Sequence, residues 1–278
     1  MRRNALNRSE NILMLPYALW ILLFVFAPLV LLVYQSFLNI ERAFTFENIL
    51  IYFTSATYLS MTFQSFLFAG LITAVTLFVS YPAAYILTKT THKELWRLLL
   101  ILPTWMNILL KAYAFIGIFS QSGIVNDWLE TVGIGRQQIL FTNMSFLLVA
   151  TYIELPFMLL PIMNAIDEID PSLVKASHDL GANTWEMIKN VIIPLSKNGV
   201  RSGIQAVFIP SLSLFMLTRL IGGNRVITLG TAIEQHFLVT QNWGMGSTIG
   251  LVLIVLMFIV MRLTSNGHAR VRRGVGNE

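Results

Sequence analysis

Cysteine is absent from this chain of 278 residues, so disulfide bonds, thiolate nucleophiles and thiolate metal ligands are excluded. Charged residues are scarce as well, at 12% of the sequence. A typical soluble domain carries about 25%. Because 55% of the residues are hydrophobic, the composition excludes an ordinary soluble domain and favours a protein of the lipid bilayer.

The sequence also lacks the patterns of common enzyme chemistry. It contains no Gly-x-x-x-x-Gly-Lys-Ser/Thr phosphate-binding loop, so any ATP that drives this protein must be hydrolysed by another chain. The histidines lie in predicted loops or in the tail, without metal-ligand spacing to acidic residues. No nucleophile is paired with a base within the apolar segments. We therefore expect no catalytic residue, no metal site and no cofactor bound by this chain.

Long apolar runs are abundant. Each approaches the roughly 20 residues that cross a bilayer as a helix. They lie at 13–38, 63–88, 98–120, 145–166, 200–220 and 246–263. The first run is too long for a signal-peptide core, and no small-residue cleavage site follows it, so we interpret it as a retained span. The runs predict an all-α, polytopic membrane protein with six transmembrane helices.

Basic residues alternate between the loops as the positive-inside rule expects. The richer loops and ends contain Arg2, Arg3, Arg8, Lys89, Lys93, Arg97, Lys175, Lys189, Lys197, Arg201, Arg262, Arg270, Arg272 and Arg273. The opposite loops contain only Arg42, Arg136, Arg219 and Arg225. The net charge of +5 therefore reflects basic residues that are distributed as in a membrane protein, and it does not indicate nucleic-acid binding. Both termini, and the polar insert that follows the fourth run, are therefore predicted to be cytoplasmic.

The polar insert, residues 167–199, predicts two short helices. Asp170 can cap the first helix, with Pro171 at its first position, where a missing N–H costs nothing. Gly181 is placed to end that helix in a left-handed turn. Leu173, Ala176, Ser177 and Leu180 share one face at helical spacing.

The second helix of the insert is predicted to begin with a capping box of Asn183 and Glu186. Its expected apolar face is Trp185, Ile188 and Ile192, and Pro194 is expected to end it. Two short helices that protrude from a membrane bundle are typical of a docking element.

The spacing of the insert resembles the EAA loop of ABC-importer permeases. That pattern is Glu-Ala-Ala, three residues, glycine, nine residues and Ile-x-Leu-Pro. The matching positions here are Lys175-Ala176-Ser177, Gly181 and Val191-Ile192-Ile193-Pro194. Lys175 stands at the glutamate position. The loop also lies where the family has it, between the fourth and fifth spans.

Other segments resemble the permeases of spermidine/putrescine importers, in particular the B-type subunit. They are 105–113, 155–158, 179–182, 192–195, 208–211 and 220–224. The resemblance implies the type I ABC importer permease fold in the bacterial cytoplasmic membrane. It implies an N-terminal helix with an outer loop at 1–60, a permease domain at 61–265 with the coupling loop at 167–199, and a basic tail at 266–278.

The same resemblance implies the partners. A homologous C-type permease would complete a heterodimeric path, and an extracellular binding protein would deliver polyamine. Two cytoplasmic ATPase subunits, with ATP and magnesium, would power import through the coupling loop. The loop residues expected to act in this coupling are Lys175, Ala176, Ser177, Asp179, Leu180, Gly181, Trp185, Ile192 and Pro194.

Two ionisable residues lie well inside the predicted spans, Lys111 and Glu154. Charges at such depth are costly and usually face the bundle interior or water. Either they form an ion pair, which we favour, or Glu154 faces the path and attracts a polyamine ammonium group. The candidate path or gate residues are Glu154, Lys111, Trp105, Tyr113, Tyr152 and Phe215.

Other functions stay open at this point. A similar permease could carry iron, sulfate or molybdate, although an anion path should present helix N-termini or arginines rather than Glu154. A channel or secondary transporter would not need the two-helix insert, and the halves of the chain show no inverted repeat. The lack of a catalytic constellation argues against an intramembrane enzyme.

Overall fold

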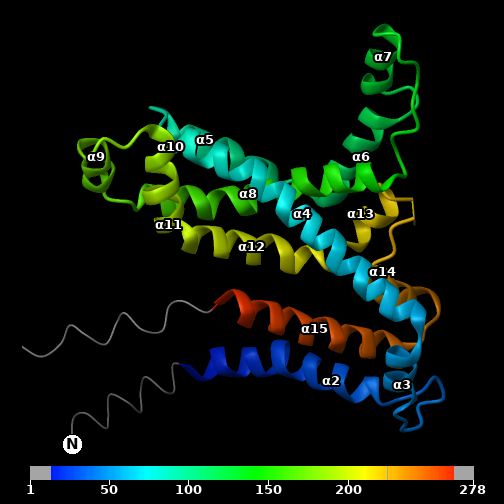
Figure 1. Ribbon diagram of the computed structural model, residues 1–278. Helices are drawn as coiled ribbons and strands as arrows, with labels where there is room; N and C mark the ends of the chain where they lie inside the picture. The colour runs from blue at the N-terminus through cyan, green and yellow to red at the C-terminus, as the bar shows by residue number, and fades with distance from the viewer. Residues whose placement is uncertain (1–13, 224, 266–278) are drawn as a thin grey trace, which may run out of the picture. The chain divides into compact units, whose positions relative to one another are not determined.

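The computed structural model describes residues 14–223 and 225–265, and this part of the chain is helical, with a single antiparallel bridge between Leu38 and Phe44 (Figure 1). The predicted all-α class is confirmed. The helices before the coupling loop are η1 (Leu22–Phe26), α2 (Ala27–Ser36), α3 (Glu47–Thr54), α4 (Ala56–Thr88), α5 (Lys93–Ile101), η2 (Leu102–Trp105), α6 (Ile108–Phe119), α7 (Ile124–Thr131) and α8 (Asn143–Asp167). Those that follow are α9 (Pro171–Asp179), α10 (Thr184–Met187), η3 (Ile188–Ile192), α11 (Ile193–Leu195), α12 (Lys197–Ser211), α13 (Phe215–Leu220), α14 (Leu229–Glu234), η4 (Gln235–Val239) and α15 (Trp243–Ser265).

Five described segments are long and apolar enough to cross a membrane. They are Met14–Ser36, Ala56–Thr88, Ile108–Thr131, Asn143–Asp167 and Trp243–Thr264. Four of them match predicted runs. The runs at 98–120 and 200–220 differ from the expectation, because each is interrupted.

The run at 98–120 is broken in its first third. α5 ends at Ile101, a 3₁₀ turn contains Pro103, and α6 begins only at Ile108. Proline restricts the residue before it and donates no backbone hydrogen bond. Asn107 then caps α6, where its side chain accepts a 2.8 Å hydrogen bond from Leu109 N.

The run at 200–220 is broken in the same manner. α12 is a helix of 15 residues with Pro210 next to its end, and α13 resumes only at Phe215. Leu212 N bonds back to Phe208 O and Ile209 O, which tightens the last turn of α12. The fifth predicted span is therefore two helices, and the longer one is too short to qualify by itself.

The chain divides into two compact units. Unit one comprises the residues up to Leu59 together with Ala232–Val255, and unit two comprises Ser60–Thr231 and the residues from Leu256. The predicted tail at 266–278 and the arginines before residue 14 lie outside the described residues.

Unit one is organised around the end of α2. Helices leave their last carbonyl groups without intrahelical partners. Here Ser36 O accepts hydrogen bonds from Asn48 Nδ2 at 3.1 Å and from Thr248 Oγ1 at 3.3 Å. The Asn48 amide also donates to Leu38 O at 2.8 Å. Buried side chains of α3 and α15 thus satisfy the end of α2 and hold the three helices together.

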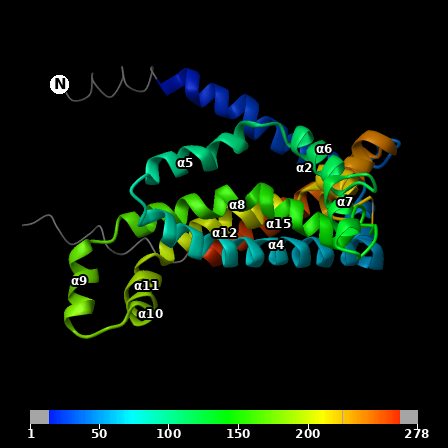
Figure 2. The same ribbon diagram turned by 90° about the horizontal axis from the view of Figure 1, so that it is seen from above.

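Unit two is built on α8, whose inner side chains are fully buried, and on its packing with α12 (Figures 1 and 2). Gly199 and Gly203, four residues apart on α12, face α8. A Cβ added at Gly199 would lie 2.5 Å from both Ala165 Cβ and Pro161 O, and one at Gly203 would lie 2.7 Å from Met158 Sδ. Small residues at this spacing let membrane helices approach at backbone distance.

Candidate functional site

The first helix of the insert forms as the sequence predicts. Asp170 caps α9 and accepts a 2.8 Å hydrogen bond from Ser172 N, with Pro171 at the first helical position. This backbone hydrogen bond favours the carboxylate and holds the pKa of Asp170 below its usual range. The cap is therefore intact at neutral pH, and its contribution is lost only as the pH falls through that lowered pKa.

Gly181 closes α9 in the predicted left-handed conformation, with φ of +83°. Its N–H bonds to His178 O at 2.9 Å, and the next amide, Ala182 N, bonds to Ser177 O at 3.0 Å. These two bonds define a Schellman motif, in which glycine is the residue that fits best. No atom lies within 4 Å of a Cβ built at Gly181, so the constraint there comes from the backbone and not from neighbouring atoms of this chain.

The second helix of the insert begins at the predicted capping box, in which Asn183 and Glu186 exchange hydrogen bonds of 2.9 Å. The prediction that Pro194 ends it is right to within one residue. The helix passes through the π-helical turn η3 and ends with α11 at Leu195, just beyond Pro194. Pro194 is tolerated because it lies in the first turn of α11, just after the hydrogen-bond register has changed.

The predicted inner face of this helix is only partly right. Ile192 is buried as expected, but the second fully enclosed side chain is Met187, and Trp185 is 68% exposed. The π turn explains the error, because it places residues five apart, such as Met187 and Ile192, on one side. A search at helical spacing does not detect such a pair.

The two helices present an exposed surface made of Leu173 on α9, Leu180 directly after α9, and Trp185 on α10. Leu180 is 89% exposed, and Ala176 lies on the same exposed face of α9. Lys175, Asp179 and Pro194 are also exposed, whereas Ser177 is half-buried and donates to Val174 O at 2.7 Å. Figure 2 shows α9, α10 and α11 protruding beyond the ends of α8 and α12.

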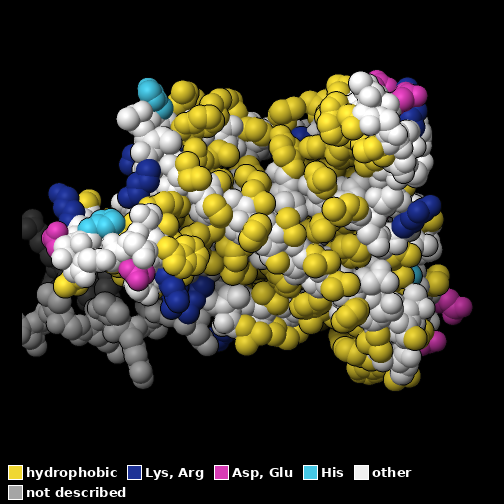
Figure 3. Space-filling view, turned by 45° about the horizontal axis from the view of Figure 1, so that its top comes forward, with side chains coloured by type: hydrophobic (Ala, Val, Ile, Leu, Met, Phe, Trp, Pro, Cys, Tyr) yellow, Lys and Arg dark blue, Asp and Glu magenta, His cyan; other side chains and the backbone are white. Residues whose placement is uncertain are grey.

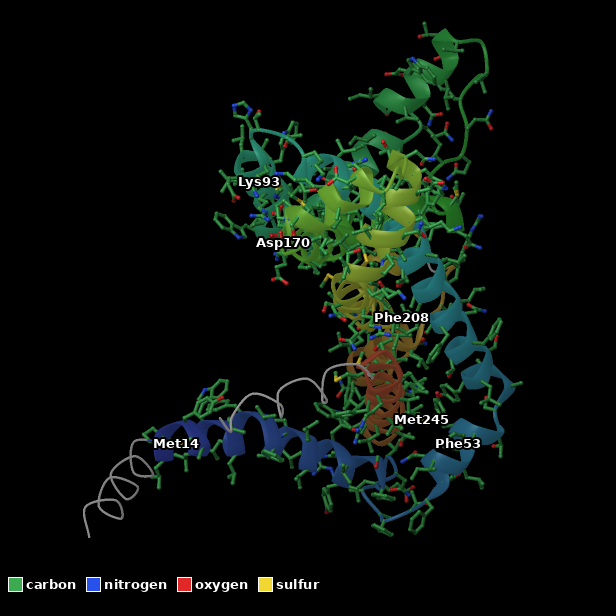
Figure 4. All side chains as sticks on the ribbon, turned by 60° about the vertical axis from the view of Figure 1, so that its left-hand side comes forward. Met14, Phe53, Lys93, Asp170, Phe208 and Met245 are labelled. Carbon is green, nitrogen blue, oxygen red and sulfur yellow. The ribbon has the colours of Figure 1, made fainter. Side chains whose placement is uncertain are left out.

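A carboxylate at the start of the insert forms ion pairs with two basic side chains, and the sequence alone did not predict these pairs. Asp167, the last residue of α8, accepts from Lys93 at 3.3 Å and also from Arg97. Arg97 pairs in addition with Glu94 at 2.8 Å. These ion pairs fix α5 to the start of the loop. Figure 4 labels Lys93 on α5 and Asp170 at the entry to α9, on the same side of unit two.

On the face shown in Figure 3, basic and histidine side chains gather at the end of unit two that carries α5 and α9, and hydrophobic side chains cover the middle of the face. Charged side chains of both signs appear again at the other end of unit two, where Arg136 pairs with Asp127 and Glu130.

The two charges inside the membrane segments are both buried. Lys111 is 8% exposed and Glu154 is 4% exposed. Within the described residues no ion pair or hydrogen bond joins their charged atoms directly, but the two opposite charges are close enough to attract each other over a longer distance. Lys111 lies in the first turn of α6, and Glu154 lies in the middle of α8.

The aromatic candidates do not form one group. Trp105 and Tyr113 are 77% and 60% exposed on η2 and α6, and Phe215 is half-buried at the start of α13. Tyr152 of α8 stacks edge-on against Phe115 of α6, with ring centroids 5.0 Å apart. This contact joins the helices that carry Lys111 and Glu154.

Comparison with known proteins agrees with these features. The family model described as "Binding-protein-dependent transport system inner membrane component" matches residues 77–273. The spermidine/putrescine transport system permease protein PotB of Haemophilus influenzae is 31% identical, covering 92% of each chain. PotB of Escherichia coli K12 is also 31% identical, covering 87% of this chain and 91% of the relative.

A solved bacterial alginate ABC transporter, in complex with an alginate pentasaccharide-bound periplasmic protein, contains a chain of similar fold. The TM-score is 0.77 with 19% identity, over 95% of this chain and 93% of that one. At this identity the likeness shows the fold alone. From the family match across most of the sequence, we conclude that this multi-pass membrane protein belongs to the inner membrane components of binding-protein-dependent transport systems.

Proposed function

We propose that the chain is a polyamine-importing permease subunit. The observation that carries the substrate is the similarity to spermidine/putrescine permeases over about nine-tenths of the chain, at 31% identity. The buried carboxylate of Glu154 supports a cationic cargo, since a buried carboxylate that has no direct ion pair can attract an ammonium group. No comparable observation favours iron, sulfate or molybdate.

The subunit works with partners that this chain does not contain. A C-type permease completes the path, an extracellular binding protein delivers the polyamine, and two ATPase subunits hydrolyse magnesium-bound ATP. The chain itself catalyses no reaction. The apolar surface formed by Leu173, Leu180 and Trp185 docks into a cleft of one ATPase subunit, because an exposed patch of this kind on a rigid capped pair of helices is typical of an interface.

The ion pairs at Asp167 connect the docking surface to the membrane helices, so that docking can move them. A displacement of α9 by the ATPase reaches α8 through the backbone and reaches α5 through Lys93 and Arg97. α5 leads directly into the break before α6, so the loop is joined to two membrane segments at its first residue.

Uptake of labelled polyamine tests the proposal. The chain, reconstituted in proteoliposomes with its partner permease, ATPase and spermidine-loaded binding protein, should accumulate spermidine or putrescine when ATP is supplied on the cytoplasmic side. Sulfate, molybdate and iron should not be taken up by the same vesicles. ATP-dependent uptake of one of these in place of polyamine would overturn the substrate assignment.

The orientation is a second prediction, and the absence of cysteine makes it easy to test. Ile134→Cys, in an exposed turn after α7, should react with a membrane-impermeant maleimide added outside intact cells. Asn198→Cys, at the exposed start of α12, should react only after the membrane is opened. Labelling of both sites from the same side would refute the orientation.

A third prediction concerns Glu154. Because Glu154 makes no direct ion pair with Lys111, Glu154→Gln should assemble normally but slow polyamine uptake by about tenfold or more, a loss of about 1.4 kcal/mol or more. The control is Lys111→Met combined with Glu154→Gln. If the two charges stabilised each other directly, the double variant would recover complex yield that Glu154→Gln had lost, since one unpaired buried charge is worse than none. Uptake and complex yield, measured for the single and double variants, decide between the roles.

A further inference from the structure

The hairpin after α2 holds an arginine in a backbone conformation that suits glycine. Arg42 has φ of +61°. The turn is fixed by hydrogen bonds from Arg42 N to Asn39 O at 3.0 Å, from Asn39 N to Ala43 O at 3.0 Å and from Ala43 N to the Asn39 side chain at 2.8 Å. Left-handed backbone is disfavoured for a long side chain, so the turn does not explain why arginine is here.

A second residue of unit one shows the same mismatch. Gln241 follows η4 with φ of +56°, between Thr240, whose N–H bonds to Gln235 O at 2.9 Å, and Trp243, whose N–H bonds to Gln241 O at 3.1 Å. Strained residues of this kind tend to gather where a protein binds or reacts.

Arg42 and Gln241 line the same cavity, which has a volume of about 220 Å³ and is completed by residues that include Gln35 and Trp243. Both side chains are exposed, and neither makes a hydrogen bond or ion pair with another described residue. A guanidinium group and an adjacent amide, both with free donors, suit a carboxylate, which accepts bidentate hydrogen bonds.

The surface around the cavity has the composition of a binding interface. Ile40, Phe44 and Phe46 are 72%, 67% and 64% exposed, and the rings of Phe44 and Phe37 stack at 5.6 Å. Trp243, which lines the cavity together with Ile40, is 52% exposed. Arginine and tryptophan dominate the strongest contacts of protein interfaces, particularly in pockets ringed by apolar groups. Figure 4 labels Met245, two residues beyond Trp243, near the start of α15.

We propose that this cavity receives an aspartate or glutamate side chain of the extracellular binding protein. The inference rests on the proposed function and on the outward orientation of this end of unit one. A single carboxylate on a shaped protein surface can reach Arg42 while avoiding Glu41 and Glu47, which are exposed on the same segment. An anionic lipid surface would meet these two acidic groups as well, so charge favours a protein occupant over lipid.

The variant Arg42→Gly distinguishes a role of Arg42 in contacting the binding protein from a role in stabilising the fold. The variant relieves the left-handed strain, so the thermal stability of the assembled complex should stay the same or rise. The binding-protein concentration that half-stimulates ATP hydrolysis should nevertheless increase about tenfold or more, since loss of a central arginine contact has effects of this size. Basal hydrolysis and the maximal stimulated rate should be unchanged.

Two further variants sharpen the test. Arg42→Lys keeps the charge and the strain, and should fall between the parent and Arg42→Gly. Glu41→Gln removes a neighbouring charge that the cavity does not use, so its half-stimulating concentration should not rise. Half-stimulation of Arg42→Gly at the parental concentration would refute the proposal.

Labelling identifies the occupant. Arg42→Cys should be modified by an impermeant maleimide from outside, and saturating spermidine-loaded binding protein should protect it. Protection by anionic lipid alone, in nanodiscs without the binding protein, would assign the cavity to lipid and overturn the inference. A parent complex that no binding protein stimulates would contradict the proposed function itself, and that result is recognisable before any variant is made.

Discussion

Replacing Gly181 by aspartate should leave the permease inserted in the membrane and paired with its C-type partner, but remove stimulation of ATP hydrolysis by the binding protein. The φ of +83° makes any side chain unfavourable by about 1 kcal/mol, which a packed membrane protein tolerates. Among the described residues, nothing beyond the chain neighbours of Gly181 lies within 4 Å of the added Cβ. We therefore expect the loss to arise at the proposed docking surface for the ATPase. Stimulated hydrolysis and ATPase retention on the purified permease pair are the measurements.

Gly133 offers a closely matched control. It ends α7 with φ of +85°, in a Schellman motif of the same form, with bonds from Gly133 N to Glu130 O and from Ile134 N to Leu129 O, both at 3.0 Å. It is also free of neighbours within 4 Å. Gly133→Asp should therefore carry the same backbone strain and keep coupling. Equal loss of coupling in both variants, or full coupling in Gly181→Asp, would refute the docking role of the loop.

Gly199→Leu should have the largest effect on assembly. Even the first carbon of the new side chain would lie 2.5 Å from Pro161 O, a backbone atom that cannot move without shifting α8. Overpacking of this kind costs about 1–3 kcal/mol and more when backbone is involved. We expect most of the permease to be lost from the membrane or recovered without its partners, as judged by complex yield and by thermal stability in detergent.

Gly70 provides the control for this substitution. It lies in the middle of α4, and nothing approaches within 4 Å of an added Cβ. Gly70→Leu should therefore give a normal yield and normal stability. If Gly199→Leu were as stable as Gly70→Leu, the close approach of α8 and α12 would not describe the protein.

The features that the sequence predicted correctly depend on local hydrogen bonds. Asp170 caps a residue two positions away, and the turn at Gly181 involves its immediate neighbours, so residue type and spacing were sufficient. The break before α6 was equally readable, because Pro103 and Asn107 are standard signals for ending and starting a helix. These two signals were overlooked because the run was interpreted from its apolar residues as one continuous helix.

The features that were missed depend on distant parts of the chain. Asp167 meets Arg97 across 70 positions, and no pattern within either segment indicates the pairing. Met187 and Ile192 share a face only because of a π turn, which has no reliable sequence signal. Local caps and turns could therefore be predicted from the sequence, whereas contacts between distant residues could not.

The glycine contact between α8 and α12 also determines how a force on the loop is transmitted. The loop leaves the membrane bundle at Asp167 and returns at Lys197, and those two helices touch at backbone distance near the return point. No long side chain separates the two helices at that point, so the close contact resists any motion that would spread the two ends of the loop apart. We therefore expect a force applied to the loop to move α8 and α12 together.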